Sequence, residues 1–237
     1  MDARLSPPGN SLLALIIPAL NEEQAIGGVL ASLPLEWFSQ ILVADNGSTD
    51  RTAWIAGNAG AEVVREARRG YGSACLAALA RLQPEIEIVV FMDGDASDDP
   101  ADLPAIVEPI LRGEAELVIG SRTLGRSEPG ALTRQQRLGN WLATRFINWC
   151  YGVRFTDLGP FRAIRRDALE RLRMADRDYG WTVEMQVKAA RQPLRVVEVP
   201  VHYRPRVGRS KISRTIKGSI LAGMKILWTV LRYRLLS

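Results

Sequence analysis

The sequence has few cysteines and no long uninterrupted apolar run. Cys75 and Cys150 are its two cysteines, and each lies in an apolar stretch that we expect to be helical. Such thiols are typical of buried structural cysteines in a reducing compartment, so a disulfide framework is excluded. No window reaches the roughly 18 consecutive apolar residues that a spanning helix requires. Residues 11–20 are apolar, but a proline interrupts them and no basic cluster flanks them, so we expect a buried strand there and not a signal peptide.

Acidic residues are absent from the last 39 positions, after Glu198. Nine of the 31 basic residues follow it: Arg204, Arg206, Arg209, Lys211, Arg214, Lys217, Lys225, Arg232 and Arg234. The body before them is mildly acidic, so the net charge of +5 comes from the tail. This asymmetry predicts an anionic partner, such as a phosphate, a membrane surface or nucleic acid. Because no nucleic-acid-binding motif accompanies the basic residues, we do not expect nucleic acid as a partner.

Apolar segments alternate with helical patterns through the first half of the chain. We expect strands at 12–17, 40–44, 61–65, 86–92 and 116–119, and helices at 22–33, 52–59, 72–82 and 101–112. Asn21 is placed to cap the first helix. This alternation predicts an α/β domain with a mostly parallel central sheet and helices on both faces. After Gly120 the alternation weakens, and we expect helices at 134–151, 165–173 and 183–191 and a last strand at 195–201.

Polar clusters follow three of the predicted strands, at residues 18–21, 45–48 and 93–95. In open sheets of this type, ligands bind beyond the carboxyl ends of the strands. We therefore expect the three clusters to meet at one edge of the sheet.

The segment Asp93-Gly94-Asp95 is the most informative of these clusters. Two carboxylates one residue apart, after a buried strand, can reach one hard cation that keeps positions open for phosphate oxygens. A solvated acidic loop is the alternative. An EF-hand loop that began at Asp93 would need glycine and glutamate where the sequence has Asp98 and Pro104. A phosphatase with an aspartyl nucleophile would usually carry these residues after its first strand.

Several motifs, in this order and spacing, resemble family 2 glycosyltransferases with the GT-A fold. They are PALNEE (18–23), VADNGSTD (43–50) and FMDGDASDDP (91–100). Four downstream motifs are similar to the dolichol-phosphate mannosyltransferase branch of that family: GSR (120–122), GN (139–140), TDLGPFR (156–162) and EVPV followed by RVGRSK (198–211). The resemblance extends over residues 12–217, nearly the whole chain.

The resemblance implies a nucleotide-sugar site with defined roles. The residues expected to bind the nucleotide-sugar are Pro18, Leu20, Glu22, Asp45, which would hydrogen-bond the base, and Asp93. Asp93 and Asp95 would also bind Mg²⁺ or Mn²⁺, and residues 69–72 would lie close to the nucleotide. Asn46 stands where the family usually has a second aspartate, and we expect it to be peripheral. Ser97 stands where the family often has glutamine or histidine, which leaves Asp98 or water as the third metal ligand.

The acceptor side is expected to bind phosphate. Residues 204–211 carry several guanidinium groups beside a glycine, a combination that suits the capture of phosphates. The resemblance places this segment over the donor diphosphate and the lipid phosphate. The residues expected to bind phosphate or acceptor are Arg122, Arg206, Arg209, Ser210 and Lys211. We expect Asp95, Arg122 and Asp157 to form the catalytic group. A hydroxyl acceptor would need a general base, either Asp157 or Glu184, whereas a phosphate acceptor is already anionic.

The tail, residues 213–237, has the pattern of a basic amphipathic helix. Apolar side chains recur within one arc of that helix, and basic side chains gather elsewhere. Such a helix can lie in a membrane interface, pack on the domain before it or form a homo-oligomer. With residues 1–10 as a disordered lead-in and 11–212 as the catalytic domain, the chain would consist of three segments.

These observations and the resemblance together predict an inverting, metal-dependent hexosyltransferase. It would move a sugar from a UDP- or GDP-sugar to a polyprenyl phosphate, as a cytoplasmic enzyme peripheral to the inner face of the membrane. Transfer to a soluble or lipid hydroxyl is the first alternative. A non-catalytic nucleotide-sugar-binding protein is the second, and the presence of both Asp93 and Asp95 argues against it.

Overall fold

One seven-stranded sheet organises the molecule. The computed structural model describes residues 12–208 and 216–235, apart from the side chains of 216–224. Within these residues the strand order is β3-β2-β1-β4-β6-β5-β7. The strands are β1 (Leu13–Ala19), β2 (Phe38–Asp45), β3 (Glu62–Arg65), β4 (Ile88–Phe91), β5 (Leu117–Ser127), β6 (Arg162–Arg165) and β7 (Val196–Tyr203). All neighbours pair in parallel except β6, which runs antiparallel to β4 and β5, so the predicted mostly parallel α/β sheet is confirmed.

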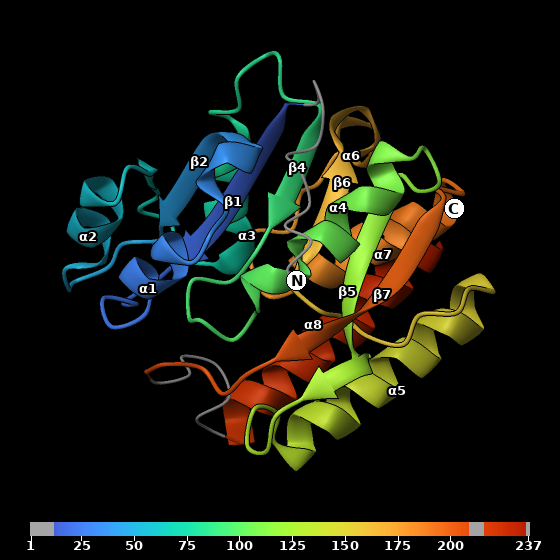
Figure 1. Ribbon diagram of the computed structural model, residues 1–237. Helices are drawn as coiled ribbons and strands as arrows, with labels where there is room; N and C mark the ends of the chain where they lie inside the picture. Colours follow the sequence, from blue (N-terminus) through green and yellow to red (C-terminus); the bar gives the residue numbers. More distant parts are fainter. Residues whose placement is uncertain (1–11, 209–215, 236–237) are drawn as a thin grey trace.

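Helices cover both faces of this sheet (Figure 1). They are α1 (Ile26–Ala31), α2 (Thr52–Asn58), α3 (Tyr71–Leu79), α4 (Leu103–Leu111), α5 (Arg134–Tyr151), α6 (Arg166–Leu172), α7 (Trp181–Arg191) and α8 (Ile216–Leu235), with short 3-10 turns at Leu35–Trp37 and Pro100–Asp102. Successive residues of a strand point to opposite faces. In β1, Leu13, Leu15 and Ile17 pack with α1, α2 and α4, whereas Ala14 and Ile16 pack with α3 and α5–α8.

Two predictions in the first half of the chain are wrong in detail. The helix expected at 22–33 is reduced to α1, because residues 22–25 form turns. Asn21 is not its cap: Ala25 holds that position, and Asn21 has a φ of 52° and accepts a hydrogen bond from the Thr49 amide at 2.8 Å. The Asn21 side chain thus joins the ends of β1 and β2 instead of starting a helix.

The second half of the chain holds a strand that was not predicted. β6 is four residues long and has an arginine at each end, so its sequence carries little apolar signal. Arg162 is nonetheless fully buried, where its guanidinium donates to the backbone oxygens of Gly159 and Thr182. β5 also runs to Ser127, well beyond the predicted end, so Arg122 lies within a strand and not after one.

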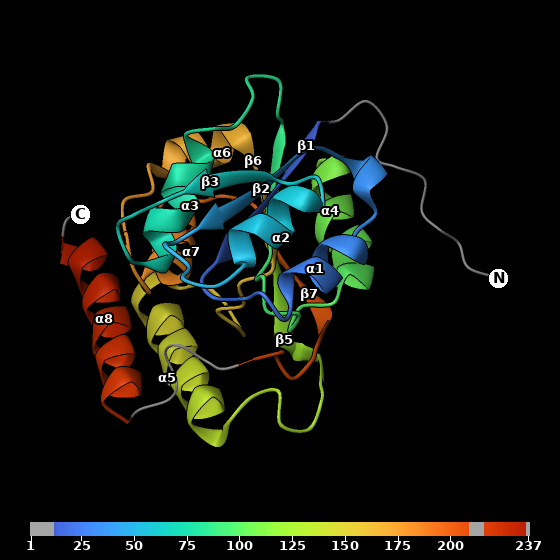
Figure 2. The ribbon, with the colours of Figure 1, turned by 90° about the vertical axis from the view of Figure 1, so that its left-hand side faces the viewer.

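Helices α5 and α8 lie side by side, apart from the helices of the opposite face (Figure 2). A reciprocal capping box between Thr133 and Gln136 starts α5, and Gly152, at a φ of 67°, ends it. The Tyr151 hydroxyl donates to the Val230 oxygen of α8 at 2.8 Å. Across the described residues, no helix is both long and apolar enough to cross a bilayer. The lead-in 1–10 lies outside the described residues, and the boundary at 212 stays a prediction.

Candidate active site

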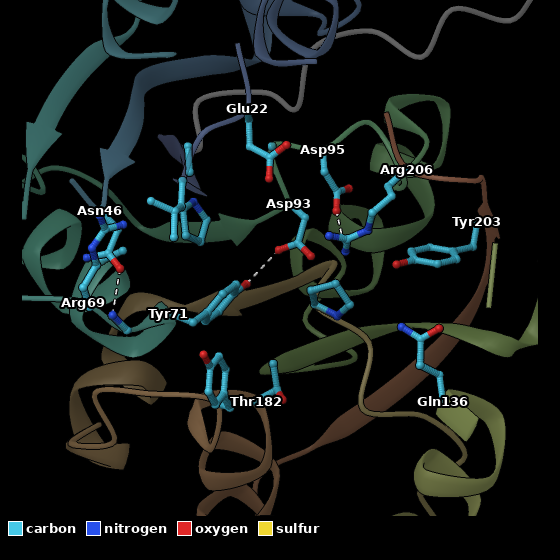
Figure 3. A pocket seen from close by; sticks show the side chains of 18 of the residues that line it. Glu22, Asn46, Arg69, Tyr71, Asp93, Asp95, Gln136, Thr182, Tyr203 and Arg206 are labelled. Carbon is cyan, nitrogen blue, oxygen red and sulfur yellow. Dashed lines mark hydrogen bonds and ion pairs between the residues drawn. The ribbon is translucent and has the colours of Figure 1, made fainter. Parts of the chain in front are cut away.

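The predicted polar clusters meet in one cavity of about 550 Å³ at the carboxyl ends of β1, β2 and β4 (Figure 3). Its lining comes from both halves of the chain: Pro18, Ala19, Leu20, Glu22, Asn46, Arg69, Gly70, Tyr71, Ala74, Asp93, Gly94, Asp95, Arg122, Gln136, Pro160, Tyr179, Thr182, Tyr203 and Arg206. Figure 3 shows Asn46 and Arg69 on one side, Arg206 and Tyr203 on the other, and the two aspartates between them. The predicted convergence at one edge of the sheet is therefore confirmed.

Asp93 lies directly after β4, in the middle of the cavity. Its Oδ1 accepts a hydrogen bond from the Tyr71 hydroxyl at 3.1 Å. Burial and the neighbouring Asp95 carboxylate raise the pKa of Asp93 to about 7. The carboxylate is thus held where its negative charge is poorly solvated, so a cation in the cavity would stabilise it.

The segment that follows β7 contacts Asp95 at both its carboxylate and its backbone oxygen. The Arg206 guanidinium contacts its Oδ2 at 2.7 Å, and the Val207 amide donates to its backbone oxygen at 2.9 Å. Its Oδ1 accepts from the Ser97 amide at 3.0 Å. This pairing brings the segment after β7 onto the aspartate loop, and the expected binding of phosphate by Arg206 stays a prediction. Arg209, Ser210 and Lys211 lie outside the described residues.

The two aspartates fit a divalent cation with partial protein ligation. Carboxylate oxygens suit Mg²⁺ and Mn²⁺, and the poorly solvated charge of Asp93 favours a bound cation. No group of three carboxylate, histidine or cysteine side chains converges among the described residues. Asp98 does not line the cavity, and its Oδ2 accepts a hydrogen bond from the Asp93 amide at 3.1 Å. The remaining ligand positions are thus left to phosphate oxygens and water.

Pro18, Leu20 and Glu22 line the cavity as predicted, but Asp45 does not. Its side chain is 5% exposed and its Oδ1 accepts from the Ser48 amide at 3.1 Å. A contact between Asp45 and the base stays a prediction. The neighbouring Asn46 lines the cavity instead, so the expectation that it is peripheral is wrong.

Asn46 holds the loop between β3 and α3 against the cavity. Its amide nitrogen donates to the oxygens of Glu66 at 3.2 Å and Arg68 at 2.7 Å, and its Oδ1 accepts from the Gly70 amide at 2.8 Å. An aspartate at this position could not donate the first two bonds. The departure from the family pattern therefore has a local reason.

Arg122 and Asp157 form a buried bidentate pair. Nε and Nη2 of Arg122 donate to the two carboxylate oxygens at 2.8 and 2.6 Å, and the Arg122 amide donates at 2.7 Å. Burial alone would lower the pKa of Arg122, but its bonds to Asp157 outweigh that effect and raise it. The guanidinium also lies 5.0 Å from the ring centre of Tyr203. Arg122 is thus a fixed positive charge at the cavity wall.

Neither predicted base lines the cavity. Asp157 is 1% exposed, and the Leu158 amide donates a fourth hydrogen bond to it at 2.7 Å. Glu184 is fully buried and accepts from the amides of Ala175 and Asp176. The geometry therefore makes Asp157 the group that orients Arg122, and its catalytic role stays a prediction.

Sequence reasoning missed several residues of the cavity wall: Gln136, Tyr179, Thr182 and Tyr203. Tyr203 ends β7, two residues beyond the predicted strand, so a longer strand would have placed it near the other strand ends. Tyr179 and Thr182 flank the start of α7 and belong to no motif. They enter the cavity because the loop before α7 packs on residues 70–73.

Comparison with known proteins decides the family. The model of Glycosyl transferase family 2 matches residues 14–173, which include β1–β6 and all the strand-end clusters. The chain belongs to this family. An uncharacterised glycosyltransferase of Mycobacterium tuberculosis is 39% identical over 213 residues, which cover 89% of this chain and 94% of that protein. A dolichyl-phosphate hexose transferase of Haloferax volcanii is 32% identical over 226 residues, which cover 94% and 96%.

A solved structure shares the fold of this family 2 enzyme. Glucosyl-3-phosphoglycerate synthase of Mycobacterium tuberculosis, in complex with Mn²⁺, UDP-glucose and phosphoglyceric acid, has a TM-score of 0.77. It is 25% identical, and the match covers 95% of this chain and 80% of that one. The predicted GT-A fold and hexosyltransferase class are thus confirmed.

Proposed function

We propose that this enzyme transfers a hexose, with inversion, from a UDP- or GDP-sugar to a polyprenyl phosphate at a membrane surface. The donor would lie in the cavity at the ends of β1, β2 and β4. Asp93 and Asp95 would hold Mg²⁺ or Mn²⁺, which offsets charge on the departing diphosphate. Arg122 and Arg206, which line the same cavity, would bind phosphate oxygens. Arg209, Ser210 and Lys211 would add to this grip.

A second hollow carries the proposal for the acceptor. It has a volume of about 650 Å³ and lies between β5, α5 and α8. Arg122 and Gln136 line both hollows, so the second begins where the first ends. Its apolar wall consists of Leu132, Trp141, Leu142, Ala143, Leu158, Ile226 and Leu227. An acceptor with an anionic head and an isoprenoid chain fits this order, with its phosphate at Arg122 and its chain along α5 and α8.

The outer face of α5 and α8 suits a lipid surface. Large apolar side chains are exposed on both helices: Leu138, Trp141, Leu142 and Trp149 on α5, and Leu227, Trp228, Leu231 and Leu235 on α8. Neither helix contains an acidic residue, whereas Arg137, Arg145 and Arg232 are exposed among these side chains. Interfacial helices combine aromatic and basic residues in this way on anionic membranes. Peripheral binding to the inner face of the membrane follows as part of the proposal.

A phosphate acceptor also agrees with the contacts of Asp157 and Glu184, the two carboxylates that could have served as a general base. A hydroxyl acceptor needs a base that can reach its proton. Asp157 is occupied by Arg122, and Glu184 lies outside the cavity. A phosphate needs no such base, because it is anionic near neutral pH. The dolichyl-phosphate hexose transferase among the relatives supports the same acceptor class.

Transfer to a soluble phosphorylated acceptor is the second candidate. The similar solved structure contains phosphoglyceric acid with its UDP-glucose, and its fold matches 95% of this chain. In such an enzyme Arg122 would bind the acceptor phosphate, and the apolar hollow would have no role.

One transfer assay separates these candidates. The purified enzyme is incubated with Mn²⁺, a panel of UDP- and GDP-hexoses, and either undecaprenyl phosphate in anionic vesicles, farnesol in the same vesicles, or phosphoglyceric acid. Mass spectrometry then identifies the product. We expect a hexosyl phosphate lipid. Transfer to farnesol or phosphoglyceric acid, with none to the lipid phosphate, would overturn the proposal.

A further inference from the structure

The loop between α6 and α7 connects the C-terminal helix to the donor cavity. We propose that α8 is a positioning element for donor binding: Lys225 and Tyr233 hold residues 175–178, and these hold Gly70–Ser73 in the cavity wall. The inference rests on the proposed function only in taking this cavity as the donor site. Every step of the connection is a directional polar contact between described residues.

The first step joins α8 to the buried carboxylate of Glu184. The Tyr233 hydroxyl donates to its Oε1 at 2.5 Å. The amides of Ala175 and Asp176 donate to its Oε2 at 3.0 and 2.7 Å. Lys188, one turn further along α7, contacts Oε1 at 2.8 Å. Because Glu184 is fully buried, each lost partner would leave unsolvated charge, so the carboxylate ties α8 to the start of the loop.

The second step joins α8 to the same loop through Asp176. Lys225 contacts its Oδ2 at 3.1 Å, and the Asp178 amide donates to its Oδ1 at 2.8 Å. Lys225 thereby holds the carboxylate that shapes residues 176–178. Two side chains of α8, eight residues apart, thus both act on this loop at Asp176, one through its backbone amide and one through its carboxylate.

The third step joins the loop to the start of α3. The Ser73 amide and hydroxyl donate to the Arg177 oxygen at 2.9 and 3.1 Å, and the Gly72 amide donates to the Asp178 oxygen at 3.3 Å. The two backbones are so close that a Cβ on Gly72 would come within 2.0 Å of the Asp176 oxygen. A shift of the loop must therefore move residues 70–73 as well.

The last step reaches the metal ligands. Gly70 and Tyr71 line the donor cavity, and the Tyr71 hydroxyl donates to Asp93 (Figure 3). Asn46 holds Gly70 from the opposite side. The position of Tyr71 beside Asp93 thus depends on two supports, Asn46 just after β2 and the loop that leads to α8.

The test compares two tyrosine hydroxyls that make hydrogen bonds at α8: Tyr233 donates from this helix, and Tyr151 donates to it. Tyr233→Phe removes the hydroxyl that contacts Glu184, and Lys225→Met removes the charge on Asp176. Tyr151→Phe is the matched control, because its hydroxyl also bonds α8, at Val230, but does not reach the loop. Calorimetry measures the Kd of UDP and of GDP, each with Mn²⁺. We expect Tyr233→Phe and Lys225→Met to raise the Kd about threefold to tenfold, and Tyr151→Phe to leave it unchanged.

A second readout does not need a ligand. Hydrogen exchange followed by mass spectrometry reports the amides of Gly72 and Ser73, which bond the loop. We expect faster exchange over residues 70–76 in Tyr233→Phe, and wild-type exchange there in Tyr151→Phe. In the calorimetry, the double variant Tyr233→Phe with Ser73→Ala should lose less binding free energy for the nucleotide than the sum of the losses in the two single variants, because both changes act on one loop.

Two outcomes would overturn the proposal. In the first, Tyr233→Phe and Lys225→Met show wild-type hydrogen exchange over residues 70–76 and the wild-type Kd for the nucleotides. In the second, Tyr151→Phe has the same effect as they have, which would make α8 a general packing element. If the wild-type enzyme binds neither nucleotide with Mn²⁺, the proposed donor site fails, and the exchange comparison still decides whether α8 positions residues 70–73.

Discussion

The two hollows of the molecule, which we propose as its donor half and its acceptor half, are built by different means. In the donor half, β1, β2 and β4 are parallel neighbours, and their polar residues follow one another at the strand ends. In the acceptor half, the antiparallel β6 separates β4 from β5, and the hollow is formed by side chains of β5, α5 and α8. The wall of the first cavity that β1, β2 and β4 supply is therefore built from short motifs at the strand ends, whereas no such motif marks the wall of the second hollow, which joins residues as distant as Arg122 and Leu227.

This difference matters for chemistry. In the first cavity Asp95 and Arg206 neutralise one another, and they could exchange that pairing for a metal and a diphosphate. The second hollow has Arg122 at one end and a mainly apolar wall beyond it. The two halves meet at Arg122, so changes on either side of it should separate donor effects from acceptor effects.

The largest effect is expected in the donor half. Asp95→Asn removes a charge that the proposed cation needs, and we expect kcat to fall by about 100-fold or more. Metal-dependent nucleotide binding, measured by calorimetry, should fall with it. Asp99→Asn is the control, because Asp99 lies in the same loop but pairs with Arg204, away from the cavity lining. Full activity of Asp95→Asn would refute the metal assignment.

The next effect is expected where the halves meet. Arg122→Lys keeps the charge but loses the two-point bond to Asp157, and we expect activity to fall about 10- to 100-fold. The activity of Asp157→Asn should fall by a similar factor, because this change releases the same guanidinium. If Asp157 were instead a general base, its loss would far exceed that of Arg122→Lys, and the low-pH limb of the pH–rate profile would disappear in Asp157→Asn alone.

A smaller effect, confined to the acceptor, is expected in the second hollow. Leu142→Glu and Leu227→Glu place a charge in its apolar wall, and we expect the KM for undecaprenyl phosphate to rise about tenfold. The Kd of the nucleotide should stay the same. Leu35→Glu is the control, since Leu35 is about as exposed as Leu227 but lines neither hollow. An equal rise in the nucleotide Kd would contradict the assignment of separate donor and acceptor halves.

The smallest effect is expected at the outer surface. Trp149 is 81% exposed on α5, and Trp149→Ala should weaken binding to anionic vesicles about threefold, as co-sedimentation would measure. Trp54→Ala, on α2, removes a tryptophan that is 58% exposed and should have no such effect. Equal losses for both would mean that binding is not specific to α5 and α8.

The same contrast explains what could be predicted from the sequence. The strand-end motifs report directly on the donor half, because in a parallel sheet the position along the chain fixes the edge where a residue lies. β6 could not be predicted, since its Arg162 is satisfied by the backbone oxygens of Gly159 and Thr182, which the four residues of the strand do not reveal. Asn46 was misjudged because its role depends on the loop at residues 66–70, whose path is set by tertiary contacts.

Glu184, which lines neither hollow, shows the same limit. A carboxylate in the first turn of a helix is typical of a dipole partner or of a catalytic group. Its actual contacts, to residues 175 and 176 and to Tyr233, join segments that are 8 to 49 residues apart. The contact with Tyr233 depends on the packing of α8 on α7.

One labelling experiment tests the division into two halves most directly. A farnesyl phosphate that carries a photoreactive group on its chain is irradiated with the enzyme in the presence of Mn²⁺ and UDP or GDP, and the labelled peptides are mapped by mass spectrometry. The account predicts labels within residues 132–143, at and just before the start of α5, and on α8 at residues 226–227, with competition by undecaprenyl phosphate. Labels confined to residues of the donor cavity, or spread over the surface without competition, would contradict it.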